Sequence, residues 1–541
     1  MSKKNILLFF IDALRFDLVN DAATRKELMP TLDQLLENGF YNRVVANAGA
    51  TQYVLPSILT QSYPLDYDGY NTGIEKRPKS IIEQFKEEGY VTYATVSSYL
   101  YMRVPGFFRG FDHIRGLYPV FRVINKVIVH QISHEINLWR KGVKDKREVL
   151  SIIQFWFGRV LGGLKEYCEN HPETKYANRF RRRNVALAPR IAAELALLKE
   201  APEKVLKKLT DIEPYFYWTT FGDRDVTWRS RLIKNCERVY SRLAKPLFWT
   251  GLLPRHLRYQ DMPVDEMVLD LPRFLQDAKK ANKPWFLYLH ILNIHSFQVT
   301  PGFYHQLKKY RLIPRVYLAR RRLGRTWQPF MHDLTLLDLD LRFGKLLSDL
   351  KAAGELSDDT VIAVFGDHGM SYGDTGSVAD SHRGFRTHRV FLDTVLAVAG
   401  TDRKPSDDTI IDSLGLSATL MDLVEIPPHE TYKGISALSG GREFIISETA
   451  GRGNCDIDKK DLYFTVTSKT HKLFTALRDD RLEVISLINT VKDPDELEDI
   501  KDNPDNVPII NKLMDAIYTE RNEILTRRHV PNPREPMAAE A

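Results

Sequence analysis

The sequence predicts an α/β fold: a three-layer α/β/α core with a mostly parallel central sheet, a helical basic insertion and a smaller C-terminal α+β subdomain. Two observations indicate the core and its insertion. Apolar runs such as Asn5–Ile11 alternate with amphipathic helical patterns on both sides of residues 117–262, as in doubly wound sheets. Residues 117–262 themselves are helical in pattern, basic and aromatic. A third observation, a series of short strand-like runs after residue 441, indicates the subdomain.

These changes of pattern divide the chain into four parts. Residues 1–116 form the N-terminal part of the core, 117–262 the insertion, 263–440 the remainder of the core, and 441–541 the C-terminal subdomain. A chain of 541 residues exceeds the size at which one hydrophobic core usually stops growing, so such additions are expected. We expect the insertion to act as a cap or lid.

The first strand of the core ends in a candidate functional residue. Asn5–Ile11 is apolar almost throughout, which favours a central strand buried on both faces. It ends at Asp12, and open α/β sheets bind ligands beside the carboxyl ends of their strands. The other elements expected here are strands at Tyr41–Ala46 and Tyr90–Val96 and helices at Met29–Asn38 and Ser80–Glu88.

After the insertion, two further strands end in polar residues. Trp285–Leu292 leads to His295, and Thr360–Phe365 leads to Asp367 and His368 between two glycines that would permit a turn. The remaining core elements expected are a strand at Val395–Val398 and helices at His332–Leu350 and Ser413–Val424. In the subdomain, strands are expected at Phe444–Ser447, Leu462–Thr467 and Lys472–Ala476, and a helix from Val507.

Composition narrows the class of protein. A hydrophobic share of 43% and a charged share of 27% are typical of soluble globular proteins, and a net charge of +7 favours anionic ligands or surfaces. Three distant cysteines argue against a disulfide framework and favour the cytoplasm. The sequence shows neither the roughly 20-residue apolar run of a transmembrane segment nor a recognisable nucleic-acid-binding module.

The insertion carries basic and aromatic patches that bear on possible partners. The aromatic patches are Phe155–Phe157 and Leu247–Trp249, and a basic run lies at Arg181–Arg183. Peripheral contact with a membrane stays open for the aromatic patches, but we expect them to pack against the main domain. The basic run is interpreted as a solvated helix face, with an anionic partner as the alternative.

Thr51 has two interpretations. It follows the small residues Ala48, Gly49 and Ala50 and precedes an apolar run, so its hydroxyl could be presented as a nucleophile where a turn enters a buried helix. Alternatively, it is an ordinary helix N-cap. Together with Asp12, Asp367 and His368, its oxygen would suit a divalent cation, with Mn²⁺ or Zn²⁺ preferred and Ca²⁺ or Mg²⁺ left open.

Five segments together resemble the sulfatase branch of the alkaline phosphatase superfamily. Asp12–Asp17 (DALRFD) resembles its D-x-L-R-x-D opening motif, and Thr51–Pro64 resembles its nucleophile segment, which ends in T-G-x-Y-P. Gly366–Gly369 resembles its S-D-H-G metal motif, and Asn293–His295 its D-P-H motif. His382 matches the His or Lys that contacts substrate oxygens in that family.

The resemblance implies an α/β/α core and a covalent intermediate on Thr51 during hydrolysis or transfer of a phosphate or sulfate ester. It implies that Asp12, Thr51, Asp367 and His368 bind the metal and that His295 and His382 act in catalysis. Asn71 and Arg15 are weaker candidates for the substrate pocket. Because Asn293 replaces the acid of D-P-H, a single ion is expected, while His290, His295 and His388 leave a second ion open.

One departure from the family motif favours phosphoryl chemistry. Sulfatases of this family use a formylglycine made from Cys or Ser within C/S-x-P-x-R, whereas this chain has Thr51, Tyr53 and Leu55 at the three defined positions. Maturation is therefore not expected, and an unmodified threonine can attack phosphorus directly, as in the phosphatase and phosphodiesterase members.

Two alternatives stay open. One is a sulfatase that works with unmodified threonine, and the other is a non-catalytic relative that binds an anionic polymer or partner. For an enzyme, the expected partner is an anionic phosphate or sulfate ester, glycan-linked or lipid-linked. The oligomeric state is open, a homo-oligomer included.

Overall fold

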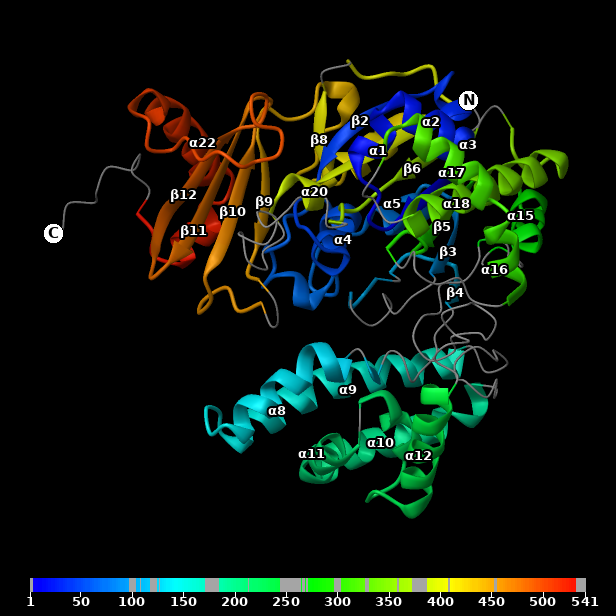
Figure 1. The fold of residues 1–541 in the computed structure, drawn as a ribbon, viewed down its shortest axis with the longest axis vertical. Helices are drawn as coiled ribbons and strands as arrows, with labels where there is room; N and C mark the ends of the chain where they lie inside the picture. The colour runs from blue at the N-terminus through cyan, green and yellow to red at the C-terminus, as the bar shows by residue number, and fades with distance from the viewer. Residues whose placement is uncertain are drawn as a thin grey trace.

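The computed structural model contains an α/β core, a group of helices and a second, smaller sheet. Figure 1 shows the core at the upper right, the helices of the insertion below it and the smaller sheet to its left. Within the described ranges, every helix is too short or too polar to cross a bilayer. The structure describes residues 3–96, 104–107, 109–116, 124–125, 127–170, 184–212, 214–243, 264, 268, 271–295, 303–325, 330–357, 360–371, 387–406, 409–451 and 455–531.

The central sheet confirms the predicted fold class. Its strands run in the order β4-β3-β5-β1-β6-β7-β2-β8, and only β7 among them pairs antiparallel with its neighbours. Strand β1 therefore lies in the interior of the sheet, between β5 and β6. The strands are β1 (Asn5–Ile11), β2 (Phe40–Val45), β3 (Val91–Val96), β4 (His113–Gly116), β5 (Trp285–Ile291), β6 (Thr360–Phe365), β7 (Asp393–Ala399) and β8 (Ile410–Asp412).

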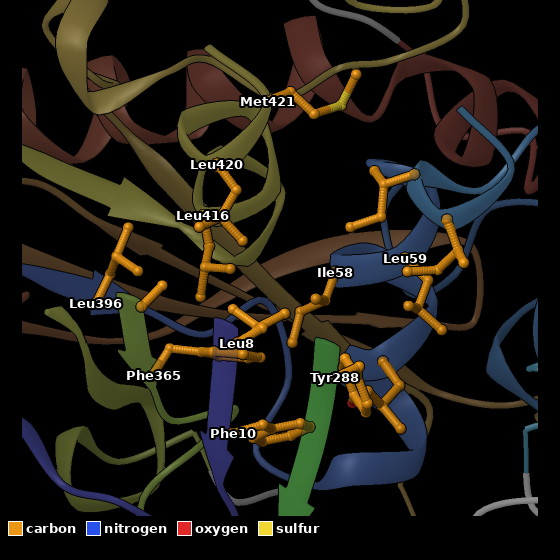
Figure 2. Close-up of a cluster of buried hydrophobic side chains, with 14 of the residues drawn as sticks. Leu8, Phe10, Ile58, Leu59, Tyr288, Phe365, Leu396, Leu416, Leu420 and Met421 are labelled. Carbon is orange, nitrogen blue, oxygen red and sulfur yellow. The ribbon is translucent and has the colours of Figure 1, made fainter. Parts of the chain in front are cut away.

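Helices cover both faces of this sheet because successive side chains of its strands point to opposite sides. Leu8 and Phe10 of β1 pack against two helices that lie between β2 and β3 and one that follows β8, as Figure 2 shows for Ile58 and Leu416. Leu7 and Phe9 pack on the other face. The first group is α4 (Thr51–Thr60), α5 (Ile81–Glu87) and α21 (Ser413–Leu423); the second is α1 (Phe16–Asn20), α2 (Ala22–Leu28), α3 (Pro30–Leu36), α15 (Leu271–Lys280) and α18 (Phe330–Ala352).

Further helices lie beside the core. Helices α16 (Phe303–Tyr310) and α17 (Ile313–Arg322) both contact α18, and the short helix α20 (Arg389–Leu392) precedes β7. The 3₁₀ turn η1 (Tyr70–Thr72) follows α4, against which it packs.

The helices of the insertion have a hydrophobic core of their own, so the expectation that their aromatic residues pack against the main domain is wrong for Phe157. This side chain is fully buried, and its ring lies 5.0 Å from that of Tyr217, also in the insertion. Phe155 is 51% exposed. The patches Arg181–Arg183 and Leu247–Trp249 lie outside the described residues. The helices are α8 (Ser133–Arg140), α9 (Lys146–Asn170), α10 (Ala188–Glu200), α11 (Pro202–Asp211) and α12 (Trp228–Leu243).

The C-terminal part contains an antiparallel sheet in the order β12-β11-β10-β9. Strand β12 was missing from the sequence prediction, because most of its side chains are only partly buried and give no continuous apolar run. It follows a tight turn in which Asp479 and Asp480 both have positive φ. The elements are β9 (Ile445–Thr449), β10 (Leu462–Thr467), β11 (His471–Arg478), β12 (Arg481–Asn489), α22 (Val507–Glu520) and α23 (Asn522–Arg527). The four domain limits remain predictions.

Buried ion pairs join this C-terminal part to the chain that follows α4. The Arg521 side chain is 2% exposed, with Nε 2.7 Å from Glu448 Oε2 and one terminal nitrogen 2.9 Å from Asp66 Oδ1. Glu448 in turn accepts a hydrogen bond from the backbone N–H of Leu65 at 2.7 Å. Burial alone would raise the pKa of Asp66, but Arg521 and Lys433 lower it below its ordinary value.

We expect Arg521→Met to lower the free energy of unfolding by about 3–5 kcal/mol, because it leaves the buried carboxylate of Glu448 without its cation and leaves Asp66 paired with Lys433 alone. Urea unfolding followed by circular dichroism measures this change. Arg527→Met is the matched control, because Arg527 pairs with Asp458 where both side chains are about half exposed, and should cost less than about 1 kcal/mol. Equal costs for the two variants would contradict the structural role of the buried pairs.

Candidate active site

Asp12 lies directly after the central strand in a strained turn. Its backbone N–H donates to the carbonyl of Ile291 at 2.9 Å, so the pairing of β1 with β5 extends to it. The next residue, Ala13, has φ of 66°, a left-handed conformation that non-glycine residues rarely adopt. In this conformation the N–H of Ala13 donates to Asp367 Oδ1 at 3.2 Å. The turn therefore ties Asp12 to the end of the neighbouring strand.

Asp367 and His368 follow β6. The positions on either side of them require glycine, because a larger side chain would collide with neighbouring atoms. A Cβ atom on Gly366 would lie 2.1 Å from Thr394 Oγ1, and one on Gly369 would lie 2.1 Å from the carbonyl oxygen of Val390. Neither glycine is among the residues with positive φ. The glycines therefore allow close packing where the chain leaves β6, and not a left-handed backbone conformation.

The His368 ring is oriented by its own loop. Its Nδ1 lies 2.6 Å from the carbonyl oxygen of Gly369, which can only accept, so Nδ1 carries the hydrogen. In the neutral ring this leaves a lone pair on Nε2, which lies 3.6 Å from Asp12 Oδ1 and 3.5 Å from Asp367 Oδ2. A hydrogen bond to the other ring nitrogen is the usual way in which proteins orient a metal-binding histidine.

Thr51 points into this cluster, and the helix-cap interpretation is wrong. Thr51 is the first residue of α4, while the N-cap position belongs to Ala50 and has no side-chain cap. Its Oγ1 lies 3.2 Å from Asp12 Oδ2, to which it donates, and 3.1 Å from His368 Nε2. The side chain is half-buried, whereas Asp12, Asp367 and His368 are buried. The hydroxyl therefore borders the cluster on its more accessible side.

The cluster fits a divalent cation. Asp12, Asp367 and His368 each offer a ligand atom within 4.8 Å of the others. Among the described residues, Asp12 Oδ1 and Asp367 Oδ2 are buried without a hydrogen-bond partner, which is costly for a carboxylate unless a cation compensates it. The chemistry of two carboxylates and one imidazole suits a transition-metal ion and does not identify which one.

The two carboxyl groups have opposite pKa shifts. Burial alone would raise the pKa of Asp12, but the imidazoles of His295, His290 and His368 outweigh it and lower the value. Burial dominates at Asp367 and raises its pKa, to which the charge of Asp12 adds. Asp12 is therefore the more strongly ionised of the pair.

His290, which the sequence left open only as a ligand of a second ion, borders the site. Within the part of the chain that the structure describes, neither ring nitrogen of this buried residue of β5 has a hydrogen-bond partner, and its Nε2 lies 3.9 Å from Asp12 Oδ2. Its ring stacks on Phe10 of β1 at 4.0 Å. The sequence does contain a signal, because an imidazole within an otherwise apolar central strand is a buried polar group that calls for a partner.

The structure gives fewer contacts between the acidic cluster and the other four predicted site residues. The His295 ring centroid lies 6.2 Å from that of His368. Arg15 is buried, and its Nε and a terminal nitrogen donate to the two carboxylate oxygens of Asp17 at 2.9 and 2.5 Å. Asn71 lies in η1, and its carbonyl accepts a hydrogen bond from Arg159 of α9. His382 lies outside the described residues. The roles of these four residues remain predictions.

His388 was considered as a further metal ligand, and the structure places it in other contacts. Its Nδ1 caps α20 by accepting from the N–H of Val390, and its Nε2 donates to the carbonyl of Asp495 at 3.0 Å. Both nitrogens thus have partners outside the Asp12 cluster.

Comparison with known families identifies the chain. The sulfatase family model matches residues 4–150 and 231–426. This chain belongs to the sulfatase family. The family, part of the alkaline phosphatase superfamily, consists of ester hydrolases, and the match includes Asp12, Thr51, Asp367 and His368. Residues 151–230, which the model does not match, lie within the helical insertion. The comparison with curated proteins finds no significant match.

Solved structures of sulfatases and related enzymes have the same fold. A Bacteroides thetaiotaomicron protein described with glycosaminoglycan metabolism is 12% identical, with a TM-score of 0.54 over 98% of this chain and 100% of its own. A Bacteroides fragilis protein assigned to the sulfatases is 13% identical, with 0.53 over 98% of each. The phosphonate monoester hydrolase of Agrobacterium radiobacter is also 13% identical, with 0.53 over 96% of each. At these identities the likeness to this sulfatase-family chain shows the fold alone.

Proposed function

We propose that this sulfatase-family protein is a metal-dependent hydrolase or transferase of phosphate mono- or diesters that acts through a covalent intermediate on Thr51. One observation carries the proposal. The Thr51 hydroxyl lies 3.1 Å from His368 Nε2 and 3.2 Å from Asp12 Oδ2, at the accessible side of a buried acidic cluster. A threonine needs activation by neighbouring groups to act as a nucleophile, and it has such neighbours here.

Asp12, Asp367 and His368 would hold the cation, with the Thr51 oxygen as a fourth ligand. Mn²⁺ or Zn²⁺ fits the mixed oxygen and nitrogen set best, and Ca²⁺ or Mg²⁺ fits it less well. When bound, the ion would lower the pKa of the Thr51 hydroxyl and offset the negative charge of the ester.

The proposed reaction uses this chain's own residues in two steps. Oγ1 of Thr51, which releases its proton to solvent, forms a bond to phosphorus while the bond from phosphorus to the departing alcohol oxygen breaks. In our assignment His295 donates a proton to that oxygen, and His382 holds the non-bridging oxygens. Water, or an acceptor alcohol in a transferase, then attacks phosphorus and gives its proton to His295, while the bond from phosphorus to Oγ1 breaks and Oγ1 regains a proton from solvent. Arg15 and Asn71 are assigned to the surrounding substrate pocket.

The side chain at position 51 favours phosphoryl over sulfuryl transfer. The sulfatase aldehyde requires a Cys or Ser precursor, whereas oxidation of a threonine at the same carbon would yield a ketone. The downstream residues Tyr53 and Leu55 also depart from the maturation motif. A sulfatase that uses unmodified Thr51 is the second candidate, because the similar Bacteroides thetaiotaomicron structure is described with glycosaminoglycan metabolism. The substrate under either proposal is an anionic ester, glycan-linked or lipid-linked.

A panel of aryl phosphate monoesters, diesters and sulfates, assayed with Mn²⁺ and with Zn²⁺, tests the proposal. We expect turnover of at least one phosphoester class, and its loss on chelation followed by recovery on metal addition. Enzyme treated with a chelator gives the background rate of hydrolysis. Initial rates with metal give kcat/KM for each ester. A preference for sulfate would support the second candidate. Metal binding without turnover of any ester would instead favour a non-catalytic protein that binds an anionic polymer or partner.

A further inference from the structure

Helix α12 of the insertion exposes a row of apolar side chains. Trp228 is 70% exposed, Leu232 52%, Val239 57% and Leu243 75%. At about 100° per residue these four positions fall within an arc of about 60° on the helix surface. Isolated exposed apolar residues are ordinary, but four on one side of a single helix form two pairs in line, with about 10 Å between Leu232 and Val239.

A row of arginines lies beside this apolar row. Arg231, Arg238 and Arg242 are exposed, and helical periodicity places them together about a quarter turn from the apolar row. Over its length the sequence of α12 contains five basic residues and one acidic residue. The helix thus combines an apolar strip with a strongly positive flank.

We propose that α12 docks the protein on a bilayer that contains anionic lipids, with the helix axis parallel to the membrane surface. The bilayer interface supplies an apolar phase for Trp228 and its exposed row, and negative headgroups for the exposed arginines. Tryptophan is also the side chain most typical of membrane interfaces. Because the described helices are too short or too polar to cross a bilayer, the contact is peripheral.

Charge and chemistry favour this occupant over two others. An anionic glycan would engage the arginine row but would leave the apolar row in water. A second copy of the chain would bring an identical basic row to the interface, and the like charges would repel each other. Figure 1 shows α12 in the helical group below the α/β core, so docking would hold the insertion at the membrane.

A natural cysteine allows the contact to be observed directly. The chain has three cysteines, of which Cys168 and Cys455 are buried and Cys236, on α12, is exposed. We would label Cys236 with an environment-sensitive fluorophore and titrate vesicles of phosphatidylcholine with or without phosphatidylglycerol. The expected result is a blue shift with phosphatidylglycerol present and binding at least about tenfold weaker without it, because each arginine gains from anionic headgroups. High salt should weaken the binding.

Matched variants separate the helix from general surface effects. Leu232→Glu should weaken vesicle partition by about tenfold or more, since it places a charge in the apolar row. Leu497→Glu is the control, because Leu497 is a leucine in the C-terminal part with a similar exposure of 60%. Arg242→Gln should weaken partition about fivefold, the effect of one cation near an anionic surface. Circular dichroism would verify that every variant is folded.

Four outcomes would overturn the proposal. They are failure to bind either vesicle type, equal binding to both types, equal losses in Leu232→Glu and Leu497→Glu, and light scattering that shows a dimer lost in Leu232→Glu. Heparin serves as the probe for an anionic polymer, and heparin binding without vesicle binding would identify a polymer as the occupant. None of these measurements uses enzymatic activity, so the result is independent of the proposed reaction.

Discussion

Replacing Thr51 with alanine should reduce phosphoester turnover by about a thousandfold or more, because the proposed covalent intermediate then has no oxygen on which to form. The Thr51 oxygen contacts both Asp12 and His368, so its loss removes the attacking atom and leaves the buried acidic cluster intact. Steady-state kinetics with the best aryl ester measures the effect, with the fall expected in kcat.

Thr51→Ser is the matched variant for this experiment. Serine keeps the hydroxyl at the start of α4, and Tyr53 and Leu55 still exclude the maturation motif, so this variant should retain substantial phosphoester activity. In a separate experiment, rapid quenching of the wild-type enzyme during turnover should yield a phosphorylated peptide that contains Thr51. Mass spectrometry would identify this peptide. Full activity of Thr51→Ala, or a phosphoryl group on another residue, would contradict the assignment of the nucleophile.

Asp367→Asn should abolish metal binding and, like Thr51→Ala, reduce turnover by about a thousandfold. The amide is almost isosteric, and its oxygen can still accept from the N–H of Ala13, as Asp367 Oδ1 does at 3.2 Å. The group that replaces Oδ2, however, is an NH₂ that cannot bind a cation. Atomic emission measures metal content, and the same aryl ester assay measures activity.

Without bound metal, the Asp367→Asn variant should have a higher free energy of unfolding than the wild type. Burial raises the pKa of Asp367, so its ionised form is disfavoured in the folded protein. The resulting loss of stability begins as the pH rises above the ordinary carboxyl pKa and is complete above the raised value. Neutral asparagine removes the cost. Metal-free Asp367→Asn should therefore resist urea better than the metal-free wild type near neutral pH, whereas a residue needed only for folding would give the reverse.

Asp338→Asn is the control for the metal measurement. Asp338 is also buried, but it lies on α18 and pairs with Arg342 at 3.0 Å. This variant should retain its metal. Retention of a full metal complement by Asp367→Asn would contradict the site, and so would equal metal loss in both variants.

The local pattern of the sequence predicted much of the fold, because the apolar runs of buried strands leave a local signal. Asn5–Ile11 and Thr360–Phe365 are strands with the predicted bounds. Strands of a different kind escaped this reasoning. Strand β8 pairs over only three residues at the edge of the sheet, and β12 is only half-buried. Neither strand therefore gives a distinct apolar run in the sequence.

The sequence by itself determined which groups stand at the ends of strands: Asp12 after one apolar run, Asp367 and His368 after another. Only the tertiary structure decided that these groups converge, because the order β5-β1-β6 joins segments far apart in the chain. It also decided that Ala50 is the N-cap of α4 and that the Thr51 hydroxyl faces the acids. A side chain's partners depend on what packs beside it, and local pattern does not contain that information.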